Sequence, residues 1–264
     1  MGTIRGIRPD GTELRKRVSA KTDRLMIREG LATIDISGIT DGTALTVFEV
    51  GFPDGVAPFD LTPLAGLGAL EQVALECTSA FSLAPFAECT ALRSLGIRLT
   101  SDEGIDLAPL AGHPTLQRLS LSLKGAPALD LAPLASIEGL EGLSVSGGAW
   151  SRLDLGPLAA LPLRQLTLDS ARLDQIALHP VARPSLEYLS LMKQAFTDLD
   201  TYDLRTATSL ATLNLGGNEL ASLDLTGLAG LASLTRVYWP NVKHLHLEDG
   251  TEVRSPAVAA FLGR

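Results

Sequence analysis

Aromatic residues and cysteines are scarce in this chain of 264 residues. Phe, Trp and Tyr make up 5% of the sequence, whereas hydrophobic residues make up 45%. The core is therefore expected to be aliphatic, and a ligand site built from several stacked aromatic rings is not expected. The two cysteines, Cys77 and Cys89, are too few for a disulfide framework. We expect both to be buried, unreactive thiols.

Long apolar runs are also missing, and none approaches the ~20 residues that a membrane-spanning helix needs. The first residues hold no apolar segment typical of a secretory signal, and Gly6 stands where an N-myristoylation site needs Ser or Thr. We therefore expect a cytoplasmic protein without membrane association. The 22 Lys and Arg against 30 Asp and Glu give a net charge of −8, which argues against nucleic-acid binding.

Sequence motifs of catalysis are absent as well. The chain contains no G-x-S-x-G, P-loop, H-E-x-x-H or paired C-x-x-C string. His244 and His246, near Glu248 and Asp249, are spaced like weak metal ligands, but such a pair is more typical of a solvated strand face. We therefore expect no enzymatic activity, no cofactor and no metal.

What the sequence does contain is a repeat. The string L-x-x-L-x-L, with conservative replacements, recurs at intervals of 22–25 residues. A second string, D-L-x-P-L-A, follows the same period, with clear copies at 60–65, 106–111, 130–135 and 154–159. The copies of the first string begin at Leu45, Leu70, Leu92, Leu116, Leu140, Leu163, Leu186, Leu210 and Leu234.

This repeat resembles that of leucine-rich-repeat proteins. Residues 210–220, LATLNLGGNEL, match the whole L-x-x-L-x-L-x-x-N-x-L consensus, and D-L-x-P-L-A resembles the bacterial internalin-like subclass. The resemblance covers residues 45–247. It implies an α/β fold, a leucine-rich-repeat solenoid with a curved parallel β-sheet on the concave face and short 3₁₀ or irregular convex segments. Only Asn218 fills the usual Asn position, so the loops that follow the strands are expected to be less regular than in the family.

The chain outside the repeats is expected to cap them, because a terminal repeat exposes its apolar side. We assign residues 1–24 to a basic N-terminal arm, 25–44 to an N-terminal cap and 248–264 to a C-terminal cap. Residues 1–28 hold eight Lys and Arg against three acidic residues. They are the one candidate segment for nucleic acid or an acidic partner, although we favour its folding back on the acidic body.

The aspartates of the D-L-x-P-L-A string share one slot of the repeat, so stacking places them in a column. A column of like charges needs either a cation such as calcium or hydrogen bonds from backbone N–H groups of the following turn. Ser82 in the same slot favours the hydrogen bonds. The column consists of Asp60, Asp106, Asp130, Asp154, Asp200 and Asp224.

In each strand the residues between the buried leucines are expected to point out of the concave face. Small and hydroxyl-bearing residues occupy the middle of this face, and bulky or charged residues lie toward its ends. Tyr and Arg are enriched at the energetic centres of protein interfaces. Trp239, at a leucine position, is expected in the core. The expected partner-binding residues are Arg98, Arg118, Tyr188, Met192, Arg236 and Tyr238.

These observations favour a non-catalytic, monomeric protein-binding module. Its concave face would hold an unidentified protein or peptide, and an inhibitor or immunity-type role suits a rigid concavity that covers another protein's active site. This step depends on the family resemblance, because a fold alone does not fix a function. The alternative is an adhesion or extracellular ligand-binding module, which would require a secretion or anchoring signal.

Overall fold

The leucine period places one strand in nearly every repeat of the computed structural model, which describes residues 2–28, 30–40, 42–51 and 57–263. Contacts divide the chain into two units, residues 1–139 and 140–264. Residue 1 of the predicted arm, residues 29 and 41 of the predicted N-terminal cap, residues 52–56 of the first repeat and residue 264 of the C-terminal cap lie outside the described residues.

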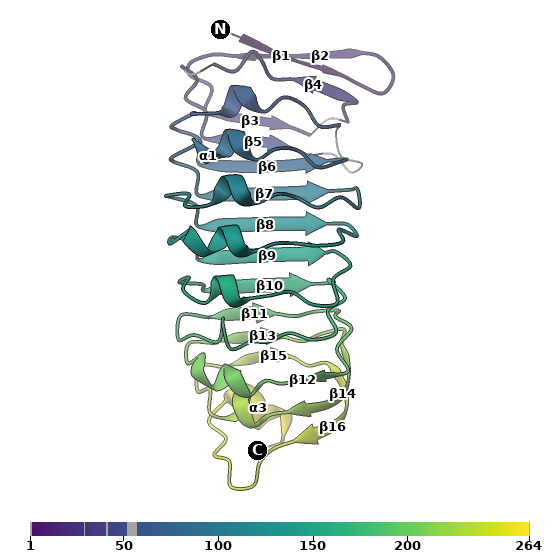
Figure 1. Cartoon of the computed structure of the whole chain (residues 1–264), viewed down its shortest axis with the longest axis vertical. Helices are drawn as coiled ribbons and strands as arrows, with labels where there is room; N and C mark the ends of the chain where they lie inside the picture. Colours follow the sequence, from purple (N-terminus) through teal and green to yellow (C-terminus); the bar gives the residue numbers. More distant parts are fainter. Residues whose placement is uncertain (1, 29, 41, 52–56, 264) are drawn as a thin grey trace. The chain divides into compact units, whose positions relative to one another are not determined.

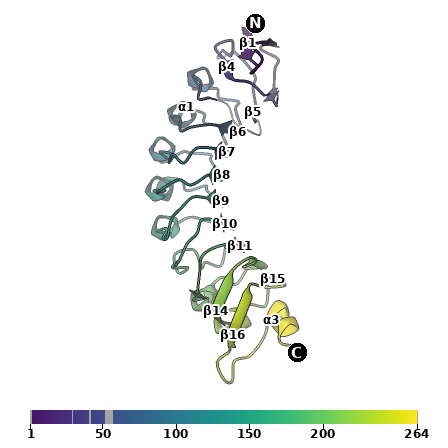
Figure 2. The ribbon, with the colours of Figure 1, turned by 90° about the vertical axis from the view of Figure 1, so that its right-hand side faces the viewer.

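The first unit contains five parallel strands, which pair in the order β3-β5-β6-β7-β8. Short helical turns return the chain from one strand to the next and lie on one side of the strands (Figures 1 and 2). The strands are β3 (Arg24–Ile27), β5 (Val47–Val50), β6 (Gln72–Cys77), β7 (Ser94–Leu99) and β8 (Arg118–Leu123). The turns are η1 (Thr62–Leu64), α1 (Ala84–Ala87), η2 (Ala108–Leu110) and η3 (Ala132–Ser136).

A small antiparallel sheet has the strand order β2-β1-β4. Along the chain, β1 and β2 come before β3, and β4 lies between β3 and β5. It consists of β1 (Gly2–Ile7), β2 (Glu13–Val18) and β4 (Thr33–Asp35). The basic N-terminal segment thus forms a hairpin, β1–β2, whose first strand pairs with β4. Ile4 and Val18 are buried, whereas Arg15 and Arg17 are exposed. The hairpin therefore has a buried apolar side and a solvated basic side.

The second unit repeats the design with strands that pair in the order β9-β10-β11-β13-β15. These strands are β9 (Gly142–Gly147), β10 (Gln165–Asp169), β11 (Tyr188–Ser190), β13 (Thr212–Asn214) and β15 (Arg236–Tyr238). Its helical turns are η4 (Gly156–Leu158), η5 (Tyr202–Thr206) and α2 (Thr226–Ala229), and α3 (Pro256–Phe261) follows the last strand. Together with the structural likeness reported below, this arrangement confirms the predicted leucine-rich-repeat fold.

The second unit also contains a sheet that the sequence analysis did not predict. Parallel strands β12 (Asp198–Leu199), β14 (Glu219–Asp224) and β16 (Asn241–His246) pair in that order, where only irregular or 3₁₀ structure was expected. β14 and β16 lie in front of the unit in Figure 2. Both flanks of these last coils are therefore hydrogen-bonded between repeats.

The core is aliphatic, as expected, and it follows the repeat. In β8, for example, Leu119, Leu121 and Leu123 are buried, whereas Arg118 and Ser120 are exposed. This alternation is the period of two that a strand with one buried face requires. Each D-L-x-P-L-A string adds two more buried leucines, such as Leu107 and Leu110. A single coil could not bury these side chains alone, so the repeats depend on stacking.

The aspartates of the column accept hydrogen bonds from the backbone two residues later, which confirms the capping hypothesis. Oxygens of Asp60, Asp106 and Asp130 accept from the N–H groups of residues 62, 108 and 132 at 2.8–2.9 Å. Asp154, Asp200 and Asp224 accept equivalent bonds, and the Ser82 hydroxyl accepts from Ala84 N–H. Bonds from Thr62 lower the pKa of Asp60. The column thus satisfies the first N–H of each helical turn.

Two side-chain amides, the buried Asn218 and the half-buried Gln194, order the loops after β11 and β13. Asn218 donates to the carbonyls of Leu191 and Leu215 and accepts from the Gln194 N–H. Gln194 makes equivalent hydrogen bonds one repeat earlier. Its Nε2 donates to the carbonyl of Leu168, and its Oε1 accepts from Leu173 N–H. Gln194 occupies the same position after Leu186 as Asn218 does after Leu210, so in this repeat a glutamine fills the consensus Asn position.

The C-terminal helix α3 packs on the last strand of the second unit. Ser255 caps it by accepting a hydrogen bond from Val258 N–H, and Pro256 begins it. Val258 is fully buried, and the Phe261 ring stacks on Trp239 with centroids 4.0 Å apart. Trp239 was expected in the core, but it is only half-buried, with the Phe261 ring of the cap stacked on it. No described helix has the length and apolarity that a bilayer crossing requires.

Candidate functional site

The strand face of the first unit is the side of its parallel sheet opposite the helical turns. Strand register arranges its side chains in lateral rows. One row holds Glu49, Ala74, Gly96 and Ser120, on neighbouring strands β5 to β8. The next row toward the strand ends holds Glu76, Arg98 and Ser122, and Arg28 follows directly after β3. The sequence pattern had predicted that the strand positions of these rows face outward, but it had not placed Arg28 among them.

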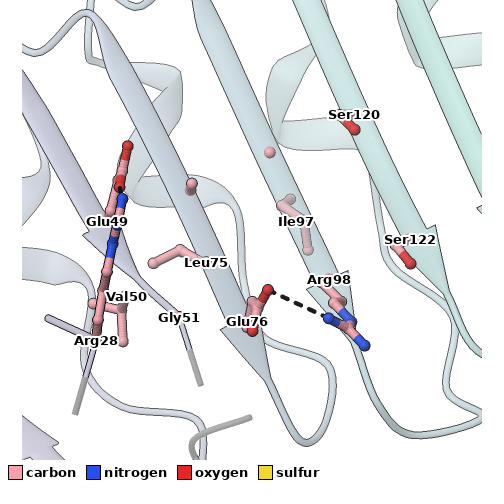
Figure 3. Close-up of a pocket in the computed structure, with 12 residues that line it drawn as sticks. Arg28, Glu49, Val50, Gly51, Leu75, Glu76, Ile97, Arg98, Ser120 and Ser122 are labelled. Atoms are coloured by element: carbon pink, nitrogen blue, oxygen red, sulfur yellow. Dashed lines mark hydrogen bonds and ion pairs between the residues drawn. The ribbon is translucent and has the colours of Figure 1, made fainter. Parts of the chain in front are cut away.

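These two rows enclose a pocket of about 700 Å³. Ala74 and Gly96 leave the middle of the rows without large side chains. Figure 3 shows Arg28 and Glu49 on one side of the pocket, the Glu76–Arg98 pair at one end, and Ser120 and Ser122 on the far side. The pocket is thus a shallow hollow in the sheet, with charged groups and hydroxyls around a small-residue floor.

Two exposed ion pairs border this pocket. Arg28 Nη2 lies 3.2 Å from Glu49 Oε2, and Arg98 Nη1 lies 3.5 Å from Glu76 Oε1. The arginine side chains are 72% and 52% exposed, whereas both glutamates are 31% exposed. Exposed ion pairs of this kind contribute ~0–1 kcal/mol to stability, so their exchange for another partner costs little.

The structure separates Arg98 and Arg118, the two predicted partner-binding arginines of the first unit. Arg98 lies beside Ser122 in the strand register, and Arg118 lies beside Ser94. Because four residues of an extended strand span ~13 Å, Arg98 and Arg118 lie near opposite ends of adjacent strands. Of the two, Arg98 lines the pocket. Arg98 and Arg118 therefore belong to one basic face but not to one cluster.

In the second unit, the structure brings Tyr188, Met192, Arg236 and Tyr238 to one strand face but keeps them apart. Tyr188, Thr212 and Arg236 form one lateral row, so a whole strand separates Tyr188 from Arg236. Tyr238 is 50% exposed beside Asn214 in the next row. Met192 is half-buried, and its N–H donates to Asp169. These side chains offer a broad surface with separated anchors.

A tyrosine–arginine contact does exist in this unit, at a position that the sequence analysis did not select. Arg205 lies over the Tyr202 ring, 3.8 Å from its centroid, on η5 and therefore away from the strand face. Tyr202 is 49% exposed. The pair contains the same residue types as the predicted partner-binding residues Tyr188, Arg236 and Tyr238. Its substitution is therefore a matched control for theirs.

Groups with catalytic or metal-binding potential are dispersed or buried. Burial raises the pKa of the Cys77 thiol to about 12 and also raises the pKa of Cys89, so both are poor nucleophiles. Both thiols are free. His113 is buried, and burial lowers its pKa. In the described part of the chain, no three His, Cys, Asp or Glu side chains are grouped as metal ligands.

Arg28, Glu49 and Glu76 are site residues that the sequence analysis did not select. The outward positions of Glu49 and Glu76 were predictable, but their pairing with arginines of neighbouring strands was not drawn from the sequence. Arg28 was counted with the basic N-terminal segment. Its spacing could have indicated that it faces outward. Leu25 and Ile27 of β3 are buried, and Arg28 follows in the alternating series of Arg24 and Met26.

Comparisons with known proteins agree with this architecture. No protein-family model and no curated protein matches the chain. Among solved structures, a leucine-rich-repeat protein of Leptospira interrogans has a TM-score of 0.70 and 19% identity over 85% of this chain. An internalin of Listeria monocytogenes has a TM-score of 0.58 and 22% identity over 84%. These likenesses show the leucine-rich-repeat fold.

The matched proteins are longer than this chain. The aligned region covers 56% of the Leptospira protein and 69% of the internalin. A third structure, TLR13 in complex with a single-stranded RNA, has a TM-score of 0.51 and 16% identity, and the match covers 37% of its length. The fold is therefore shared with proteins of several sizes.

Proposed function

We propose that this chain is a non-catalytic protein-binding module that holds a protein or peptide on its strand faces. The observation that carries the proposal is the pocket of about 700 Å³ on the first unit, bordered by exposed, exchangeable arginine–glutamate pairs. The face of the second unit adds exposed Tyr238 and Arg236. Rigid strands hold these groups in fixed positions, which lowers the entropy cost of binding.

Within this proposal the protein acts as a cytoplasmic monomer of the inhibitor or immunity type, which covers a functional surface of its partner. We also propose that it belongs to the internalin-like subclass, which the D-L-x-P-L-A strings and the likeness to an internalin support. That same likeness favours the second candidate, an adhesion or extracellular ligand-binding module. The two candidates differ in where the partner is found.

The test is capture of partners from a lysate and, separately, from the external fluid of the native organism. Wild-type protein runs beside Tyr188→Ala/Arg236→Ala/Tyr238→Ala, beside Arg28→Gln/Arg98→Gln, and beside Tyr202→Ala/Arg205→Ala as the control off the strand faces. We expect one protein to be retained by wild type and the control and lost by a strand-face variant. An interface anchor is worth at least ~2 kcal/mol, or about 30-fold in Kd.

Three other outcomes would change or refute the proposal. Loss of the partner in the Tyr202/Arg205 variant alone would place binding on the helical turns. A partner found only in the external fluid would replace the inhibitor role by the adhesion role. Capture of no partner from either source would contradict protein binding altogether.

A further inference from the structure

The charge of the first strand face is opposite in sign to that of the chain. Its rows carry four arginines, Arg24, Arg28, Arg98 and Arg118, against two glutamates, Glu49 and Glu76, a net of +2. The whole chain has a net charge of −8. A positive face on a negative protein selects an acidic partner and disfavours basic ones.

We propose that the pocket of the first unit recognises an acidic segment of a protein, one of whose carboxylates enters the hollow over Gly96 and binds Arg98. This inference rests on the proposed protein-binding function and specifies its partner. Arg98 borders the pocket and is 52% exposed, so its guanidinium can be reached. Guanidinium groups bind carboxylates through paired N–H donors, with better geometry than lysine provides.

The Glu76 carboxylate, which pairs with Arg98, shows how a carboxylate of the partner could bind there. Glu76 lies 3.5 Å from Arg98, too far for a good hydrogen bond, although the contact is an ion pair. Arg28 and Glu49 form the equivalent pair across the pocket. An incoming carboxylate would replace Glu76 beside Arg98, while Ser120 and Ser122 offer hydroxyl donors on the other side.

Gly96 keeps the centre of the hollow open, and the fold does not require glycine there. A Cβ at this position would meet its nearest atoms at 3.8–4.0 Å, which is ordinary contact, and the residue does not have a positive φ. Glycine inside a strand weakens the strand and often marks a close approach by a ligand. A large side chain here would therefore fill the pocket without straining the backbone.

Protein is favoured over nucleic acid as the source of the negative charge. Single-stranded nucleic acids bind through aromatic side chains on which the bases stack. Among the described residues, the lining of the pocket includes no aromatic side chain. The acidic body of the chain would also repel a long polyanion more strongly than a short segment.

The experiment measures fluorescence anisotropy of a labelled peptide of alternating glutamate and serine, at low and moderate salt. The same peptide with lysine in place of glutamate and a labelled oligo-uridylate are the alternative probes. We expect the glutamate peptide to bind and to weaken with salt, since the attraction is electrostatic. Arg98→Gln and Gly96→Leu should each weaken binding about tenfold.

Two further variants give the proposal its sharpest test. Glu76→Gln removes the competing carboxylate, so it should strengthen binding of the glutamate peptide, whereas a site for basic side chains would be weakened by it. Arg93→Gln is the matched control, because Arg93 is exposed in the same repeat but does not line the pocket. It should leave affinity within twofold. Thermal melting shows that each variant is folded.

Failure of this inference can be told from failure of the proposed function. If the capture experiment yields a protein partner but the glutamate peptide does not bind, the acidic segment is refuted and protein binding stands. Preferred binding of the lysine peptide, or equal weakening by Arg93→Gln and Arg98→Gln, would also overturn the inference. Binding of oligo-uridylate that depends on Arg98, without peptide binding, would replace it by a nucleic-acid site.

Discussion

At the scale of single residues, the alternation within one strand separates stability from binding. Leu143 in β9 is buried and belongs to the core, whereas its neighbour Ser144 lies in the outward row beside Thr167. Leu143→Asp would place an unpaired charge in that core and should lower the free energy of unfolding by at least about 3 kcal/mol. Ser144→Asp should change it by less than about 0.5 kcal/mol.

Denaturant titration of both variants measures this difference. A Leu143→Asp protein as stable as wild type would show that the strand register is wrong by one residue. An equally large loss of stability in Ser144→Asp would show instead that the side chain of Ser144 is packed against other residues.

His113 makes stability depend on pH. Its Nε2 atom is buried without a hydrogen-bond partner, and Nδ1 accepts a long bond from Thr115 N–H. Burial lowers its pKa below the ordinary value of 6.5, so the unfolded chain binds a proton at a higher pH than the folded chain does. We therefore expect the contribution of His113 to the free energy of unfolding to be complete above pH 6.5 and to decrease as pH falls below it.

Urea titrations of wild type and His113→Gln above and below pH 6.5 measure this effect. We expect wild type to lose stability at the lower pH and the variant to lose clearly less. Identical slopes in the two proteins would assign the pH dependence to other groups.

The residue types on each face were predicted from the sequence, but the pairings between neighbouring strands were not drawn from it. A period of two fixes which side chains point outward, so Arg98, Tyr188 and Tyr238 were placed correctly on strand faces. The offset between neighbouring strands follows from the repeat instead: Arg98 and Glu76 share one slot and meet, whereas Arg118 stands four residues earlier in its repeat and is distant. The pocket follows from that offset together with the small volume of Ala74 and Gly96.

At the scale of elements, the aspartates of the column are capping residues, because each accepts a bond from the first N–H of a helical turn. Asp106 Oδ1 accepts a 2.9 Å hydrogen bond from Ala108 N–H at the start of η2. Asp106→Ala leaves that N–H without its partner and should cost about 1 kcal/mol of stability. Asp106→Ser should cost less, because Ser82 makes the same bond before α1.

Thermal and urea unfolding of the two variants compare these costs. Added calcium serves as the control for the cation hypothesis and should not shift the melting temperature of wild type. A stabilising shift by calcium that disappears in Asp106→Ala would refute the capping role.

The strands of the parallel sheets were predictable elements, whereas β12, β14 and β16 were not. Buried residues alternate in β8, but in β14 the buried Leu220 and Leu223 are three residues apart. No strand period exists there to be recognised. These strands form because hydrogen bonds between successive coils align them, as the pairing of Leu220 with Val242 shows. Contacts between repeats are invisible to a pattern within one repeat.

At the scale of the whole molecule, the terminal segments have a structural task that their composition does not reveal. Residues 1–28 were recognised by charge, yet the hairpin β1–β2 buries Ile4 and Val18 and pairs with β4. Gly38 lies against the backbone of Thr3, so closely that a side chain there would clash. The hairpin therefore closes the N-terminal end of the first unit as a cap does, and its charges are on the solvated side.

The capping role of the β1–β2 hairpin and the role of its basic side chains can be separated by experiment. Deletion of residues 1–20 removes Ile4 and Val18 from contact with the first unit and leaves β4 without its partner strand. An open sheet edge beside exposed apolar residues promotes association. We expect the deleted protein to melt at a lower temperature and to form oligomers in size-exclusion chromatography with light scattering. Arg15→Gln/Arg17→Gln, which keeps the hairpin, should remain monomeric with the melting temperature of wild type. A deleted protein that stays monomeric and equally stable would show that the hairpin is dispensable for the fold, and its basic side would then be the reason for its presence.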